Sequence, residues 1–262
     1  ACIVGRPTIY FVVDVFSRMV VGFYIGFENA SYVTAMQALQ VAMTDKVELC
    51  KQYGYEVTSE EWPCIGLPDA ILADRGELLG HQIEALEHSF SIRIENTAPY
   101  RGDLKPIVER YFRTAQAKFK PFAQGVVQPL KEKKRGGSDY RLDATLTIHD
   151  FKQIIIGSIL TYNLTHQLKK YDRDLDMPTD LPLVPIHLWN WGIQNRVGRL
   201  KQVSEKALRV ALLPKTKATL SDLGLKVFGV FYYCAEINQQ GWMHRKKSIS
   251  RPDTLQVAYD PS

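Results

Sequence analysis

The sequence predicts an α/β core followed by a small all-β module. Two stretches of β-branched and aromatic residues, 8–15 and 18–26, flank the segment "DVFSR" and are typical of a β-hairpin. Stretches of helical periodicity then alternate with short apolar strands as far as about residue 213. After Thr219 only short strand-like stretches follow, so we expect an α/β core with an all-β appendage.

Local signals place the first elements of the core. A helix is predicted over 31–54, because apolar residues recur at helical spacing after Ser31, a residue type that caps helix N-termini. A short apolar strand is predicted over 68–77, ending at Asp74, and another strand over 90–97. Strands and helices therefore alternate in this half of the chain, as an α/β core requires.

The second half of the chain is predicted to be helical before it becomes β-rich. Thr147 and Asp150 are expected to cap one of its helices. The expected helices cover 104–119, 148–168, 186–195 and 203–213. Three later stretches are predicted to be strands: "KVFGVFYYCAEI", "WMHRKKSI" and "LQVAYD".

These elements suggest three parts. Residues 1–168 are expected to form the α/β core, and 169–213 a proline-rich linker with two helices. Residues 214–262 are expected to form a small β-barrel.

Charge is distributed unevenly along the chain. Residues 101–141 carry 11 Lys/Arg against 4 Asp/Glu, and residues 196–262 carry 12 against 5. Residues 1–100 carry 6 Lys/Arg against 13 Asp/Glu. Two basic blocks indicate a polyanionic partner, because clustered cations release counterions from phosphate backbones. Charge alone leaves a solvated basic surface as the other interpretation.

Composition excludes several classes of protein. With 262 residues, 45% of them hydrophobic, the chain can bury a substantial core. No apolar run approaches the roughly 20 residues that a membrane helix needs, and no secretory signal opens the chain, so we expect a cytoplasmic protein. Its four cysteines are scattered, which predicts free thiols and no structural zinc. They are Cys2, Cys50, Cys64 and Cys234.

Two carboxylates stand out as candidate metal ligands. Asp74 ends a predicted buried strand, and Glu109 lies in a predicted helix 35 positions later. Carboxylates on a strand end and a facing helix suit Mg²⁺, which prefers oxygen ligands. Structural roles stay open, since Asp74 with Glu77 fits a capping box and Glu109 with Arg113 fits an i,i+4 ion pair.

Several motifs resemble a known family. "VVDVFSRMVVG", "ILADRGE" and "APYRGDLKPIVERYF" are similar to the catalytic core of DDE transposases and retroviral-type integrases. The interval from Asp74 to Glu109 matches the family's spacing between its second Asp and its Glu. "HLWNWGIQNRVGRL", "LLPKTKATLSDLGLKVFGVFYY" and "VAYDP" extend the resemblance to TnsB-like transposases, which are related to phage Mu transposase.

The resemblance implies a fold and an activity. The fold is an RNase H-like mixed sheet with flanking helices, followed by a small β-barrel. The activity is that of a DNA transposase, which cuts transposon 3′ ends by water attack and joins the 3′-OH groups to target DNA by transesterification. Two Mg²⁺ ions, for which Mn²⁺ can substitute, serve both steps. On this sequence Asp74 and Glu109 become the second and third catalytic, metal-binding carboxylates.

The position of Asp14 raises the question of the first carboxylate. Asp14, Asp74 and Glu109 could complete a D-D-E triad, and spacing leaves this open because the first interval varies within the family. "VVDVFSR" instead matches the motif of the family's second strand. We therefore expect Asp14, with Ser17 and Arg18, to stabilise the hairpin turn. The first strand and its catalytic Asp are then expected to be missing, which would leave this chain inactive by itself.

The resemblance also implies partners. Arg101, Lys105 and Arg113 are candidates for holding DNA phosphates near the site, and Lys246 and Lys247 for contacting DNA from the barrel. The implied partners are transposon-end DNA, target DNA, further copies in a synaptic oligomer, an endonuclease subunit and an AAA+ ATPase regulator. The implied location is the bacterial cytoplasm, at the nucleoid when bound to DNA.

Two other functions stay open. One is a non-catalytic DNA-binding or assembly module on the same fold, and the other is an RNase H-like nuclease that only hydrolyses. The barrel and the "KPIVER" segment favour a transposase over a simple nuclease.

Overall fold

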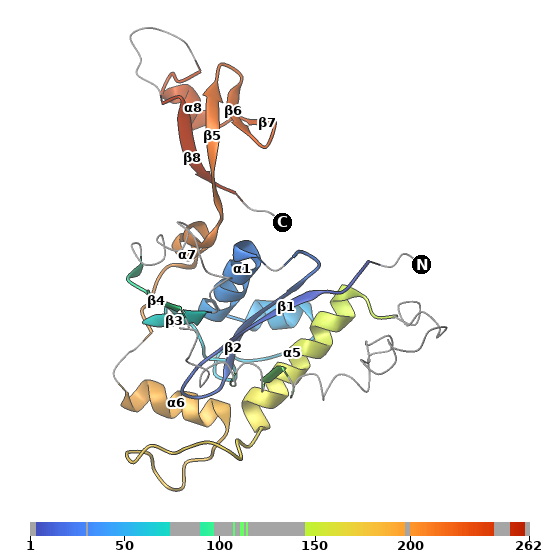
Figure 1. Cartoon of the computed structure of the whole chain (residues 1–262), viewed down its shortest axis with the longest axis vertical. Helices are drawn as coiled ribbons and strands as arrows, with labels where there is room; N and C mark the ends of the chain where they lie inside the picture. Colours follow the sequence, from blue (N-terminus) through green and yellow to red (C-terminus); the bar gives the residue numbers. More distant parts are fainter. Residues whose placement is uncertain are drawn as a thin grey trace. The chain divides into compact units, whose positions relative to one another are not determined.

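A computed structural model of the chain is shown in Figure 1. The structure describes residues 4–29, 31–73, 90–96, 107, 111, 112, 114, 145–196, 200–243 and 252–259. The chain divides into two compact units, Ala1–Glu205 and Lys206–Ser262. Both helices and sheets are present, so the predicted mixed α/β class is confirmed.

The first unit begins with the predicted β-hairpin. Strands β1 (Thr8–Val13) and β2 (Val20–Gly26) pair antiparallel, from Thr8 opposite Gly26 to Val13 opposite Val20. The register shifts between Val12 and Val13, which marks a β-bulge just before the turn. Five of the seven residues of β2 are buried, so this strand lies inside the core.

Two short helices follow where one was predicted. Ser31 caps α1 (Tyr32–Met43) in a capping box with Thr34, as expected from the sequence. Helix α1 ends at Met43, with Thr44 as its C-cap, and α2 (Val47–Gln52) begins at Val47, so the prediction of a single helix over 31–54 is wrong. Local hydrogen bonds explain the break, because the Thr44 hydroxyl donates to the Gln40 carbonyl and Asp45 accepts from the Val47 amide.

Helix α1 packs directly onto β2 at Gly22. A Cβ atom at this position would lie 2.5 Å from the backbone nitrogen of Ala42 and 2.7 Å from the carbonyl oxygen of Ala38. Both obstacles are helix backbone, which cannot move aside as a side chain can. Glycine therefore allows the close approach of helix and strand here.

Lys46, between the two helices, is a buried cation. Its side chain donates hydrogen bonds to the carbonyls of Ala42, at 3.0 Å, and of Cys64, and the residue is 1% exposed. Burial lowers the pKa of Lys46 to about 8, although Cys64 and Asp45 oppose this shift. The Lys46 ammonium thus binds a carbonyl in the last turn of α1, where a cation is favourable. Its desolvation costs free energy.

This burial predicts a pH-dependent stability. The unfolded chain titrates Lys46 near 10.5 and the folded protein near 8, so between these values the unfolded state holds more protons and the free energy of unfolding rises with pH. Relative to Lys46→Met, the wild-type free energy of unfolding should increase by about 3 kcal/mol from pH 7 to pH 10.5. Urea titrations of both proteins across this range measure the difference. A difference that stays flat would contradict the assigned burial of the charge.

A second, parallel pair of strands lies in the same unit. Strands β3 (Ala70–Ala73) and β4 (Arg93–Asn96) pair from Ala70 opposite Arg93 to Ala73 opposite Asn96. Both strands were predicted. Parallel strands are usually covered on their faces, and Ile71 in β3 is accordingly buried, as is Ile92 directly before β4.

Two helices complete the described part of the first unit. Helix α5 (Ile148–Thr165) begins with the predicted capping box of Thr147 and Asp150. It packs against α6 (Pro185–Asn195) and contacts β2 through a fully buried face. That face includes Ile155, Ile156, Ile159 and Asn163. Both helices were predicted within three residues at each end.

The second unit is a small sheet with two short helices. Helix α7 (Glu205–Leu212) leads into four antiparallel strands in the order β7–β6–β5–β8. Their bounds are β5 Lys215–Ser221, β6 Gly224–Val227, β7 Val230–Tyr232 and β8 Thr254–Ala258. Within its described residues the sheet is open between β7 and β8, so the predicted closed barrel is not formed by these strands.

Two details of the second unit differ from the prediction. Strand β5 already begins at Lys215, before the expected change at Thr219. The segment "CAEI", predicted as strand, lies mainly in helix α8 (Ala235–Gln239), where Ile237 is buried. A five-residue helix is too short to display a helical period, so the aromatic residues before it dominated the prediction.

The described cysteines are free thiols, as predicted. Cys50 and Cys64 are buried free thiols, and Cys234 is an exposed one. In the described parts of the chain, no helix is both long and apolar enough to cross a membrane.

Candidate functional site

Asp14 lies in the turn between β1 and β2 and makes the contacts predicted for it there. Its Oδ2 accepts hydrogen bonds from the Ser17 amide, at 2.7 Å, and the Ser17 hydroxyl, at 2.6 Å. Its backbone pairs with Met19 and Arg18, and Arg18 adopts a left-handed conformation with φ of 63°. These bonds stabilise a tight turn. The assignment of Asp14 as structural rather than catalytic stays a prediction.

The turn packs against the segment that follows α5. The guanidinium carbon of Arg18 lies 5.9 Å from the ring centroid of Tyr171. Burial raises the pKa of Tyr171, and the nearby Arg18 and Arg196 partly offset that rise. The carboxylates of Asp14 and Asp174 also act on this phenol. Charged groups from distant parts of the sequence therefore meet beside the turn.

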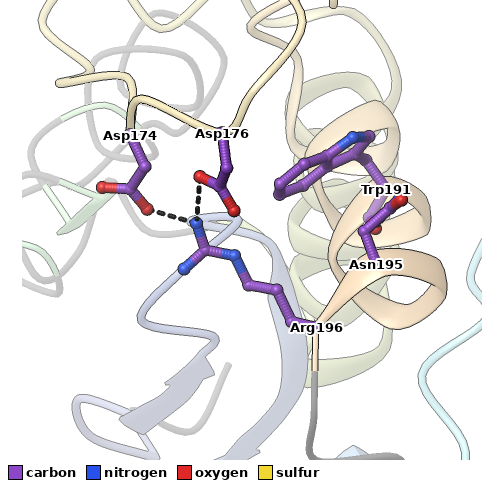
Figure 2. A network of polar contacts seen from close by, with 5 residues as sticks. All are labelled: Asp174, Asp176, Trp191, Asn195 and Arg196. Atoms are coloured by element: carbon purple, nitrogen blue, oxygen red, sulfur yellow. Dashed lines mark hydrogen bonds and ion pairs between the residues drawn. The ribbon is translucent and has the colours of Figure 1, made fainter.

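An arginine–aromatic cluster lies at the C-terminal end of α6. We define it by Phe16, Asp174, Asp176, Trp191 and Arg196, and Figure 2 shows all of these except Phe16. The Arg196 guanidinium lies 4.4 Å from the centroid of the Phe16 ring and 5.4 Å from that of Trp191. It also donates hydrogen bonds to the carboxylates of Asp174 and, at 3.2 Å, Asp176.

The geometry of this cluster indicates a structural role. Two carboxylates balance the charge of Arg196, both through contacts with its Nη2 atom. A Cβ atom on Gly192 would lie 2.8 Å from the Phe16 ring, which shows how closely the hairpin turn approaches α6. The Arg196 side chain is 37% exposed, and such ion pairs contribute at most about 1 kcal/mol. The contacts of the Arg196 guanidinium with the Phe16 and Trp191 rings add to this stabilisation.

No residue of this cluster was predicted from the sequence to belong to a functional site. Its members come from the turn, the linker and the end of α6, and no local pattern connects them. A run of aromatic residues in "HLWNWG" was the one available signal, and it is equally typical of an ordinary core helix.

Most of the predicted site residues lie outside the part of the chain that the structure describes. This holds for both predicted catalytic carboxylates and for the five predicted DNA contacts. They are Asp74, Arg101, Lys105, Glu109, Arg113, Lys246 and Lys247. Their assignments stay predictions.

Described residues nevertheless lie next to both carboxylates in the sequence. Strand β3 ends at Ala73, one residue before Asp74. Glu109 is flanked in the sequence by helical residues, in agreement with the helix predicted over 104–119. They are Ile107, Tyr111, Phe112 and Thr114. Tyr111 is 2% exposed and belongs to the hydrophobic core of the first unit.

No complete metal site is formed by the described residues alone. Among them, no group of three or more His, Cys, Asp or Glu side chains converges. The donors proposed from the sequence are both carboxylates, and their chemistry suits a hard divalent cation.

The second unit presents a basic face on its sheet. Lys217 lies opposite Gln256, and Lys226 lies opposite both Thr219 and Phe231, so these side chains share one face. All five are exposed. The Lys226 ammonium lies 5.6 Å from the centroid of the Phe231 ring. No Asp or Glu occurs among the strand residues of this face.

Comparison with known proteins identifies the class of protein. Residues 1–125 match the family model described as the TnsB C-terminal domain. Together with the similarity described next, this match shows that the chain is similar to TnsB-like transposases.

One such relative is the transposon Tn7 transposition protein TnsB of Escherichia coli. The two sequences are 54% identical over 259 residues, which is 99% of this chain and 37% of that protein. The chain therefore spans little more than a third of the relative it matches. The predicted resemblance to TnsB-like transposases is confirmed.

Proposed function

We propose that this chain forms part of the catalytic core of a DNA transposase that cuts transposon 3′ ends and transfers them into target DNA. The observation that carries the proposal is its 54% identity to a transposition protein over almost its whole length. The antiparallel β1–β2 pair and the parallel β3–β4 pair support a mixed sheet of the RNase H-like kind. We also propose that the second unit forms a small β-barrel, which would include residues beyond the four described strands.

Asp74 and Glu109 are proposed as two carboxylates that hold divalent metal ions. Asp74 directly follows a core strand, and Glu109 lies two residues before the buried Tyr111. When bound, two Mg²⁺ ions would activate the attacking oxygen and stabilise the leaving one. We assign Asp14 to the turn, because one of its oxygens already accepts two hydrogen bonds from Ser17. If the metal site contains three carboxylates, the first of them then belongs to a residue other than Asp14.

DNA is the proposed partner of both basic blocks. Arg101, Lys105 and Arg113 would hold phosphates near the carboxylates, and Lys246 and Lys247 would also contact DNA. Transposon-end DNA, target DNA, further copies of the protein, an endonuclease subunit and an AAA+ regulator are proposed as the assembly. The bacterial cytoplasm is the proposed location.

The test is transfer of a pre-cleaved transposon end into plasmid DNA with Mg²⁺ or Mn²⁺. It compares this chain with the full-length protein that carries the sequence. Joining by the full-length protein would support the proposal. DNA binding without joining or cleavage would favour the non-catalytic module, and cleavage without joining would favour a nuclease.

The basic face predicts a salt-dependent affinity for DNA. Lys217→Ala and Lys226→Ala should each lower the slope of log affinity against log salt concentration by about 0.9, because each phosphate contact releases about one counterion. Lys51→Ala is the matched control, since Lys51 is an exposed lysine of α2 in the more acidic first 100 residues, and its slope should not change. Fluorescence anisotropy at several salt concentrations measures the slopes. If the slopes of Lys217→Ala and Lys226→Ala equal those of Lys51→Ala and the wild type, this face does not contact DNA.

A further inference from the structure

Tyr111 connects two elements that are distant in the sequence. Its ring centroid lies 4.8 Å from that of Phe11 in β1, with the planes at 89°, and 4.8 Å from that of Tyr162 in α5, at 69°. Phe112 also contacts Phe11, with centroids 4.8 Å apart. Two successive helical residues thus pack against the same phenylalanine of the sheet. We call Phe11, Tyr111, Phe112 and Tyr162 the aromatic clamp.

The rings of the clamp make these contacts, and the Tyr111 hydroxyl does not. Tyr111 is 2% exposed, and its Oη has no hydrogen-bond partner among the described residues. Burial raises the pKa of this phenol, so the hydroxyl stays protonated. Edge-to-face pairs add to the stabilisation from area burial and restrict the rings to a few orientations. Such packing fixes the local backbone as well as stabilising it.

We propose that the aromatic clamp positions Glu109 for metal binding, with Tyr111 as the main positioning residue. This inference rests on the proposed function. Glu109 lies two residues before Tyr111, so a shift of the Tyr111 backbone is passed on to it. Mg²⁺ demands near-ideal octahedral geometry, and a ligand held within about 0.5 Å needs a rigid supporting shell. The clamp supplies that rigidity from β1 on one side and α5 on the other.

The chain offers a matched control for this proposal. Phe11 and Phe23 lie directly opposite each other on β1 and β2 and are 9% and 5% exposed. Phe11 contacts Tyr111 and Phe112, whereas the Phe23 ring stacks on Trp62, with centroids 6.3 Å apart. Phe11→Leu and Phe23→Leu therefore remove the same atoms from the same layer of the core. Only the first change loosens the clamp.

The experiment measures rigidity, metal affinity and activity in the full-length protein. Hydrogen–deuterium exchange of the peptide covering 105–115 is recorded without metal, Mn²⁺ affinity by electron paramagnetic resonance, and strand transfer against Mg²⁺ concentration. Phe11→Leu and Tyr111→Leu should speed this exchange and raise both the Mn²⁺ Kd and the half-maximal Mg²⁺ concentration at least fivefold. Tyr111→Phe should match the wild type, because it keeps the ring. Phe23→Leu should lower the Tm as Phe11→Leu does but leave the metal dependence unchanged.

Several outcomes would overturn the proposal. Equal metal dependence of Phe11→Leu and Phe23→Leu would leave the clamp with a stabilising role only. A Tyr111→Phe protein that behaves like Tyr111→Leu would show that the hydroxyl matters and the ring does not. If Tyr111→Leu does not fold, the milder Phe112→Leu must show the same shift, or the proposal fails. Full activity of Glu109→Gln would instead overturn the proposed function itself.

Discussion

Replacement of Glu109 by glutamine, or of Asp74 by asparagine, is expected to abolish strand transfer by the full-length protein. Each change keeps the size of the side chain and removes the negative charge that a divalent cation requires. Loss of an outer-shell partner of a metal ligand costs about 10–100-fold in activity, so loss of a ligand itself should exceed about 100-fold. Gel analysis of plasmid joining with Mg²⁺ and with Mn²⁺ measures the effect.

Three controls make this result specific. Glu95→Gln changes an exposed carboxylate of β4 and should leave joining intact. DNA affinity of the Glu109→Gln and Asp74→Asn proteins should equal that of the wild type, because phosphate contacts come from the basic residues. Asp14→Asn should retain joining within a few-fold. If Asp14→Asn abolishes joining, Asp14 is the first carboxylate and its assignment to the turn alone is wrong.

Replacement of Asn163 by leucine is expected to destabilise the first unit strongly. Asn163 is fully buried on α5, and its side chain binds both backbone groups of Val20 in β2. The Val20 amide donates to Oδ1 at 3.0 Å, and Nδ2 donates to the Val20 carbonyl at 2.9 Å. Leucine has a similar shape but leaves the amide without this partner. The free energy of unfolding should fall by roughly 3 kcal/mol, because an orphaned buried donor pays its full desolvation cost.

The matched control is Asn195→Leu near the end of α6. Asn195 also donates from Nδ2 to a backbone carbonyl, that of Trp191, at 2.9 Å, but it is exposed. Water can replace that bond, so the change should stay within about 0.5 kcal/mol. Urea denaturation followed by far-UV circular dichroism compares the two. The Val20 carbonyl keeps its bond from Trp62 in both variants, so an effect below about 1 kcal/mol at Asn163 would mean that the Val20 amide finds a new acceptor.

The prediction of the site depended on motifs more than on physics. Residue spacing led to Asp74 and Glu109, and the resemblance of their surroundings distinguished them from a helix cap and an ion pair. By contrast, no pattern predicted that Tyr111 would lie between Phe11 and Tyr162. The contacts of one ring with a strand and a second helix depend on how the whole core closes.

The sequence by itself determined the features that short-range interactions control. The hairpin, the caps at Ser31 and Thr147, and the strand that ends at Ala73 all follow from residues a few positions apart. The TnsB-like class followed likewise from local motifs. Only the tertiary structure decided the burial of Lys46, the bond from Asn163 to β2, the arginine–aromatic cluster and the aromatic clamp. Each of these brings together residues from distant segments, and long-range packing has no periodic or neighbouring signal in the chain.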